Sequence, residues 1–149
     1  MSFDYPANWE TFTVPPSSTH FQVITYLSTQ GLSDHCDRLP NLISCERMPV
    51  GHLGLDGVFV DWSANSFFGA EFDPSRGIPL RVGGRRATLE HVDAGESCHS
   101  IGADRALRMR TDEWAPDNWN TMTACLRGPD LDYLQAQIEA MLDSVEWHR

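Results

Sequence analysis

The sequence contains no lysine: all eleven basic residues are arginine, and against twenty-one acidic residues they leave a formal net charge of −10. The use of arginine in place of lysine is typical of a GC-rich genome and does not by itself indicate guanidinium chemistry. The charge is more informative, because a phosphate backbone or an anionic lipid surface is bound by a cationic face. We therefore expect neither nucleic acid nor membrane lipid as a partner.

Long apolar runs are also missing. No stretch of about eighteen apolar residues occurs, so no membrane-spanning helix is expected. A signal peptide begins with a cationic segment that is followed by an apolar one. Residues 1–6 do not show this pattern. An exported form of the protein would therefore need a signal or anchor segment that this chain does not carry.

The usual signatures of catalysis and metal binding are absent too. There is no Cys-x-x-Cys pair, whereas structural zinc sites usually bring their ligands in pairs about two to four residues apart. There is no Gly-x-Ser-x-Gly elbow and no phosphate loop, since Gly83-Gly84-Arg85-Arg86 is better explained as a hairpin turn. We expect no catalytic residue, no metal and no cofactor.

What the sequence does contain is four cysteines in two local pairs. Cys36 and Cys45 have eight residues between them, and Cys98 and Cys125 flank a stretch with the pattern of paired strands. Of the three possible pairings we expect the local one, Cys36 with Cys45 and Cys98 with Cys125. Disulfides persist outside the reducing cytoplasm, so the pairs predict an extracytoplasmic protein, secreted or membrane-anchored. A cytoplasmic protein with four reduced cysteines is the alternative.

Apolar alternation predicts an antiparallel sheet. Two of the expected strands are joined by Gly83-Gly84 alone, which is the signature of a tight hairpin with positive φ in its turn. Residues 28–57 are rich in glycine and proline, and we expect an irregular segment there, held by Cys36 and Cys45. The expected strands are 21–27, 58–62, 78–82, 85–92, 103–111 and 119–126.

The other strong element is a C-terminal amphipathic helix. Gly128-Pro129-Asp130 has the composition of a helix start, with proline where its missing N–H is harmless. Apolar residues then recur at helical spacing from Leu131 to Val145. The expected fold class is α+β: a single domain, residues 1–149, in which an antiparallel sheet of about five or six strands packs against this helix, with room for a second, shorter one.

Two stretches carry a resemblance to known proteins. They are Phe3-Asp4-Tyr5-Pro6-Ala7-Asn8-Trp9 at the start and Thr123-Ala124-Cys125-Leu126-Arg127-Gly128-Pro129-Asp130 before the final helix. With the strand-rich middle they resemble exported actinobacterial proteins of unknown function and, more distantly, the PsbP-like α/β sandwich of small lipoproteins and photosystem accessory proteins. The resemblance implies export, an α/β sandwich and a largely non-catalytic role. No functional residue set of that superfamily maps onto this chain.

The arginines are unevenly distributed. Residues 76–110 hold seven of the eleven arginines and four acids, a balance of +3, while the other 114 residues hold four arginines and seventeen acids, a balance of −13. Such asymmetry can mark a face that attracts an acidic partner. The simpler interpretation is that Arg81, Arg86, Arg108 and Arg110 lie on the solvent side of a one-faced sheet and are paired with nearby carboxylates.

These observations favour a non-enzymatic, extracytoplasmic binding or accessory domain that meets a protein or a small anionic ligand. Trp114 is the expected exposed anchor, because tryptophan beside arginine is typical of binding hot spots. The expected binding residues are Arg81, Arg85, Arg86, Arg108, Arg110 and Trp114.

Two alternatives remain open from the sequence. A small enzyme or metal-dependent site could form around His91, Asp93, Cys98 and His99, because His91 and Asp93 would share one face of a strand and Cys98 adjoins an imidazole. The second alternative is a structural homodimer packed through the sheet.

Overall fold

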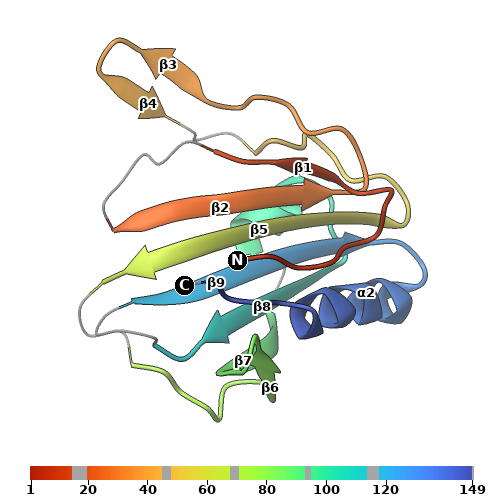
Figure 1. Cartoon of the computed structure of the whole chain (residues 1–149). Helices are drawn as coiled ribbons and strands as arrows, with labels where there is room; N and C mark the ends of the chain where they lie inside the picture. Colours follow the sequence, from red (N-terminus) through yellow and green to blue (C-terminus); the bar gives the residue numbers. More distant parts are fainter. Residues whose placement is uncertain (15–19, 45–47, 68–70, 93–94, 114–117, 149) are drawn as a thin grey trace.

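Seven antiparallel strands form one sheet that extends through the molecule (Figure 1). The computed structural model describes residues 1–14, 20–44, 48–67, 71–92, 95–113 and 118–148. Every neighbouring pair in the sheet is antiparallel. Across the sheet the order is β1 (Glu10–Phe12), β2 (Phe21–Ser28), β5 (Gly57–Ser66), β9 (Asn118–Arg127), β8 (Arg105–Thr111), β7 (Arg85–Val92) and β6 (Ile78–Val82).

One face of the sheet packs against α2 (Leu131–Asp143) and holds the larger core. Asp130 caps the helix, and its side chain accepts a hydrogen bond of 3.2 Å from the Tyr133 N–H. Because this cap fixes the helix start, Pro129 lies just outside the helix rather than in its first turn. The apolar face of the helix is buried as expected, through Leu134, Ile138, Met141 and Leu142 against Val58, Val60, Trp62, Met122, Ala124 and Leu126 of the central strands.

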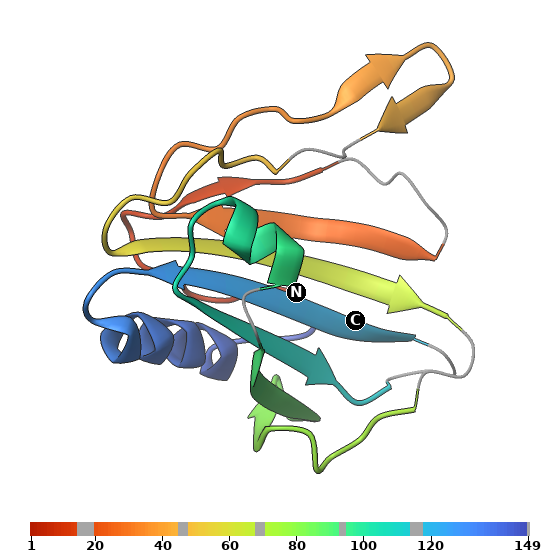
Figure 2. The ribbon, with the colours of Figure 1, turned by 180° about the vertical axis from the view of Figure 1, so that it is seen from behind.

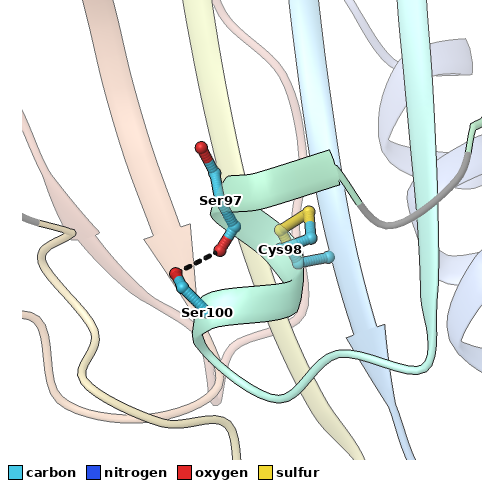
Figure 3. The surroundings of a disulfide bond; sticks show 4 residues. Ser97, Cys98 and Ser100 are labelled. Atoms are coloured by element: carbon cyan, nitrogen blue, oxygen red, sulfur yellow. Dashed lines mark hydrogen bonds between the residues drawn. A yellow bond between two sulfur atoms is a disulfide. The ribbon is translucent and has the colours of Figure 1, made fainter.

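The opposite face carries the short helix α1 (Gly95–Ser100) and a second, smaller core (Figure 2). Cys98 of α1 is bonded to Cys125 of β9, with 5.3 Å between their Cα atoms. Figure 3 shows this disulfide and, on the same helix, the hydrogen bond of 2.7 Å that the Ser100 hydroxyl donates to the Ser97 carbonyl. Phe59 and Ile101 are buried in the same core. The disulfide therefore fixes α1 to the sheet.

The β6–β7 hairpin forms as the sequence predicts. β6 ends at Val82, β7 begins at Arg85, and the two turn residues Gly83 and Gly84 have φ of 55° and 80°. Residues with a Cβ rarely adopt such angles, which is why glycine occupies both positions. This hairpin forms one edge of the sheet, and Pro79 lies on its outer strand, where a missing N–H does not interrupt a ladder.

A second hairpin, β3 (Asp37–Leu39) with β4 (Leu42–Ser44), stands away from the main sheet (Figure 1). Its tip is apolar and exposed, with Leu39 at 61% and Leu42 at 59% of full exposure. It lies within residues 28–57, for which an irregular segment is expected from the sequence. Strands of three residues are too short for alternation to be visible, so neither this hairpin nor β1 could be recognised.

The strand number is therefore larger than expected, although the architecture of an antiparallel sheet with a C-terminal helix is confirmed. All six expected strands are present, β1 adds a seventh to the sheet, and β3 and β4 form a separate pair. Neither α1 nor α2 has the length and apolar character that a helix needs to cross a membrane, as far as the described residues extend.

Candidate functional site

Four of the five arginines expected in the binding set share one face of the sheet, the face that carries α1. In the hairpin Arg81 pairs with Arg86, and across the next ladder Thr88 pairs with Arg110. Paired residues and residues two apart on a strand point to the same side, and Arg108 is two residues from Ala106 of the α1-side core. We call this set the arginine face: Arg81, Arg86, Arg108 and Arg110. Figure 2 shows that α1 does not extend over β6 and β7.

Carboxylates hold three arginines in place on this side of the sheet. Glu90 Oε2 lies 3.3 Å from Arg76 Nε, and Glu90 Oε1 lies 3.9 Å from Arg108 Nη1. Arg86 Nε donates to Asp112 Oδ2 at 2.9 Å. The Arg86 and Arg108 side chains remain 63% and 48% exposed, and ion pairs this exposed contribute only about 0–1 kcal/mol. The pairs therefore orient these guanidinium groups without shielding them from a ligand.

Arg81 differs from its neighbours because no carboxylate of the described residues lies within ion-pair distance. Its Nη1 donates to the carbonyl of Gly84 at 2.8 Å, across the hairpin turn. The interpretation in which every arginine of this surface is paired with an acid therefore does not hold for Arg81.

Arg110 is held by an aromatic ring. Its Cζ lies 4.8 Å from the ring centre of Trp119, which is only 6% exposed. Burial lowers the pKa of Arg110, but arginine starts so high that the group remains a cation. A cation stacked on tryptophan is favourable by about 0.5–2 kcal/mol. Trp119 is thus the tryptophan that shapes this face, whereas Trp114 lies outside the described residues.

The arginine face continues into a polar strip at the centre of the sheet. In the strand register, Arg108 pairs with Thr123, which in turn pairs with Asp61 of β5. The Ser63 hydroxyl donates to Asp61 Oδ1 at 2.7 Å. Burial raises the pKa of Asp61, and the Ser63 hydrogen bond opposes that shift. Burial and the nearby Asp61 charge together raise the pKa of Tyr26 to about 12.

The turn between β5 and β6 closes the outer side of the arginine face. Asp73 Oδ1 accepts hydrogen bonds from the Ser75 N–H at 2.9 Å and the Ser75 hydroxyl at 2.6 Å, and these bonds lower the pKa of Asp73. At Gly77, where φ is 94°, a Cβ would lie 2.5 Å from the Leu89 carbonyl oxygen. Glycine at position 77 therefore allows the backbone of the turn to pack directly against the backbone of β7.

An open pocket of about 340 Å³ lies between this turn and the β6–β7 hairpin. Arg81 and Arg86 supply its charge, and the Arg86 Cζ lies 5.7 Å from the ring centre of Phe72. The remaining surface is largely apolar. The lining residues are Phe72, Pro74, Pro79, Leu80, Arg81, Arg86 and Ala87.

Arg85 does not belong to this surface. It alternates with Arg86 along β7, so it points to the face that carries α2, and its Cζ lies 5.4 Å from the ring centre of Trp147. Trp147 is itself anchored, because its Nε1 donates to the Val82 carbonyl at 2.9 Å. The expected set of arginines is thus divided between the two faces of the sheet.

The cysteines are structural where they can be described. The expected Cys98–Cys125 bond is present, and both residues are buried. Cys36 is also disulfide-bonded. Its expected partner Cys45 lies outside the described residues.

The residues proposed for a metal or catalytic site do not form one within the described part of the chain. His91 and His99 are exposed, Cys98 has no thiolate while it is bonded to Cys125, and Asp93 lies outside the described residues. A different group does gather: ligand atoms of Asp34, His35 and Cys36 lie within 4.8 Å of one another. Because Cys36 is disulfide-bonded, that group also lacks the thiolate that a zinc ion binds.

Three further residues belong to the site although they are not expected from the sequence. Phe72 approaches Arg86 only because the Asp73 turn folds back onto the hairpin. Trp119 contacts Arg110 across the β8–β9 ladder. The only sequence signal for this role was the position of Trp119 at the start of an expected strand. Asp61 interrupts the apolar run from Val58 to Trp62. A single acidic residue within such a run was the available signal.

The chain was compared with protein-family models, curated proteins and solved structures, and none of them matches it.

Proposed function

We propose that this protein is a non-enzymatic, extracytoplasmic binding domain whose arginine face receives carboxylate groups of an acidic protein or a small anionic ligand. The observation that carries the proposal is the gathering of Arg81, Arg86, Arg108 and Arg110 from three strands onto one face of a protein with a net charge of −10. Arginine suits this role because its planar group donates two parallel hydrogen bonds to a carboxylate.

Two further features support a binding role. The arginines are presented by strands of one continuous sheet, so their positions are held before a ligand arrives, which lowers the entropic cost of binding. Asp61, in the polar strip beside them, is engaged in a structural hydrogen bond from the Ser63 hydroxyl. The PsbP-like superfamily that the sequence resembles is largely non-catalytic, which also favours binding over catalysis.

The disulfides support the proposed extracytoplasmic location. Cys98 and Cys125 are 2% and 1% exposed, and such a buried bond is typical of proteins that fold where thiols are oxidised. A chain located outside the cytoplasm would meet its carboxylate ligand there.

A hexaglutamate peptide tests the proposal, because it offers carboxylates without an apolar surface. Calorimetry should detect binding to the wild-type protein, at least tenfold weaker binding to the Arg81→Glu, Arg108→Glu double variant, and further weakening as salt rises. The matched control is Arg38→Glu with Arg85→Glu, which makes the same change in net charge away from the arginine face. Equal loss in both double variants, or no binding to the wild type, would contradict the proposal.

A further inference from the structure

The pocket beside the hairpin combines a charged wall and an apolar wall. Arg81 and Arg86 are direct cross-strand neighbours, so their guanidinium groups emerge side by side. The rest of the lining includes the ring of Phe72 and the proline rings of Pro74 and Pro79. A ligand that fills the pocket therefore has to present an anionic group at one end and an apolar body at the other.

The charge of the pocket fits one negative charge. Two guanidinium groups face it, and the charge of one of them, Arg86, is partly balanced by Asp112 through contacts from its Nε and Nη2. Arg81 contributes the remaining positive charge, since it donates to the uncharged carbonyl of Gly84 and no carboxylate within the described ranges pairs with it. A carboxylate matches this balance better than a phosphate, which carries close to two negative charges at neutral pH.

The shape of the apolar wall selects a flat group. Phe72, Pro74 and Pro79 all present ring surfaces, and Arg86 already lies against the Phe72 ring. Aromatic rings pack well on such surfaces and add stacking to the burial of their area. The volume of about 340 Å³ is at the lower end of the range for small-molecule sites, about 300–1,000 Å³, and holds one or two fused rings.

We infer that this pocket binds an aromatic monocarboxylate, whose carboxylate meets Arg81 and Arg86 while its ring lies against Phe72 and the two prolines. The inference rests on the proposed function, because it names the ligand class of one part of the arginine face. The carboxylate can belong to a small aryl acid or to the C-terminal residue of a peptide that ends in an aromatic side chain.

The test uses 1-naphthoate and its neutral analogue 1-naphthamide. In ¹⁵N-labelled protein, 1-naphthoate should shift the amide resonances of residues 72–76 and 78–87 in a saturable manner, and 1-naphthamide should bind at least tenfold more weakly. Arg81→Gln should weaken 1-naphthoate binding by about five- to tenfold, as expected for one charge-assisted hydrogen bond in a wet pocket. Phe72→Ala should weaken it as well, whereas Arg85→Gln, on the face of β7 opposite to Arg86, should leave it unchanged.

A second pair of probes identifies the source of the carboxylate. A tetrapeptide that ends in phenylalanine is compared with its C-terminal amide. The inference is supported if 1-naphthoate or the free-acid tetrapeptide binds saturably and its amide does not. The acid that binds more tightly shows which source of carboxylate the pocket prefers.

Two results would overturn the inference. Equal binding of acid and amide would show that the charged wall plays no part, and shifts that map away from the hairpin would place the ligand elsewhere. If either result is found and hexaglutamate still binds the arginine face, the inference fails and the proposed function stands. If neither hexaglutamate nor 1-naphthoate binds, both the inference and the proposed function fail.

Discussion

Arg81 and Arg86 face each other directly across the β6–β7 hairpin, a pairing of like charges at an edge of the sheet. Like charges in this position destabilise a sheet by roughly 0.2–1 kcal/mol. Asp112 offsets the repulsion only in part, because it contacts Arg86 and not Arg81. A binding role explains why two arginines occupy positions where a neutral residue would make a more stable hairpin.

Replacing Arg81 should therefore separate stability from binding. Arg81→Thr removes the repulsion and introduces a residue that strands favour, so the free energy of unfolding should rise by about 0.5 kcal/mol. Binding of hexaglutamate and 1-naphthoate should weaken at the same time. Urea unfolding measures the first effect and calorimetry the second.

Arg108→Thr is the matched control for that experiment. Arg108 pairs with Glu90 and Thr123 rather than with another cation, so its loss should not stabilise the protein. An equal gain in stability from both variants would show that strand propensity alone is responsible.

Removal of the Cys98–Cys125 bond should lower stability strongly. Its loop spans 27 positions, for which the chain-entropy model gives about 3.6 kcal/mol, and measured losses for native disulfides are about 2–5 kcal/mol. The Cys98→Ala, Cys125→Ala variant should thus unfold at a clearly lower urea concentration than the wild type, without reductant. An unchanged midpoint, or free thiols at these positions by mass spectrometry of the wild type, would contradict a structural disulfide.

Tyr26 should titrate later than an ordinary tyrosine. Its pKa is raised to about 12, by burial first and by Asp61 second, against an ordinary value near 10. The folded state therefore holds the phenol proton longer than the unfolded state, so the Tyr26 contribution to stability is complete below pH 10 and is lost as pH rises through about 12.

Ultraviolet titration of the wild type minus the Tyr26→Phe variant isolates this phenol. Asp61→Asn should move the titration to lower pH, because it removes the negative charge that disfavours the phenolate. A Tyr26 midpoint near 10 in the folded protein would rule out the buried environment described for this ring.

The raised pKa of Asp61 predicts a second pH dependence of the free energy of unfolding, at acidic pH. Burial raises its pKa in the folded state, so its contribution to stability is complete below the unfolded pKa and is lost as pH rises through the folded pKa. Asp61→Asn should accordingly raise the free energy of unfolding at pH 7 and lose that gain near pH 3. Asp143→Asn, on the exposed side of α2, is the control for removing one negative charge. A gain that is independent of pH would contradict this account.

The sequence was sufficient where short-range patterns decide the structure. Gly83-Gly84 defined the β6–β7 hairpin, the apolar stripe from Leu131 defined α2, and the local spacing of Cys98 and Cys125 suggested their bond. In each case the residues that decide the outcome are close together along the chain or follow a single period.

The candidate site depends on longer-range relations that no local pattern contains. Arg108 and Arg110 share a face with Arg86 only through the register of the β7–β8 ladder, and one residue of slippage would have pointed them to the α2 side. Phe72 lines the pocket because a turn folds back onto β7. Arg85 was grouped with Arg86 because the two are adjacent in sequence, although adjacent strand residues point to opposite faces.

The most direct test of the arginine face is a map of where carboxylates bind. Hexaglutamate is titrated into ¹⁵N-labelled protein, and the shifts of backbone amides and arginine Nε–Hε groups are followed. The proposed function predicts that saturable shifts concentrate on Arg81, Arg86, Arg108 and Arg110 and that Arg38 and Arg85 stay unaffected. Shifts spread evenly over all arginines, or confined to Arg38 and Arg85, would contradict it.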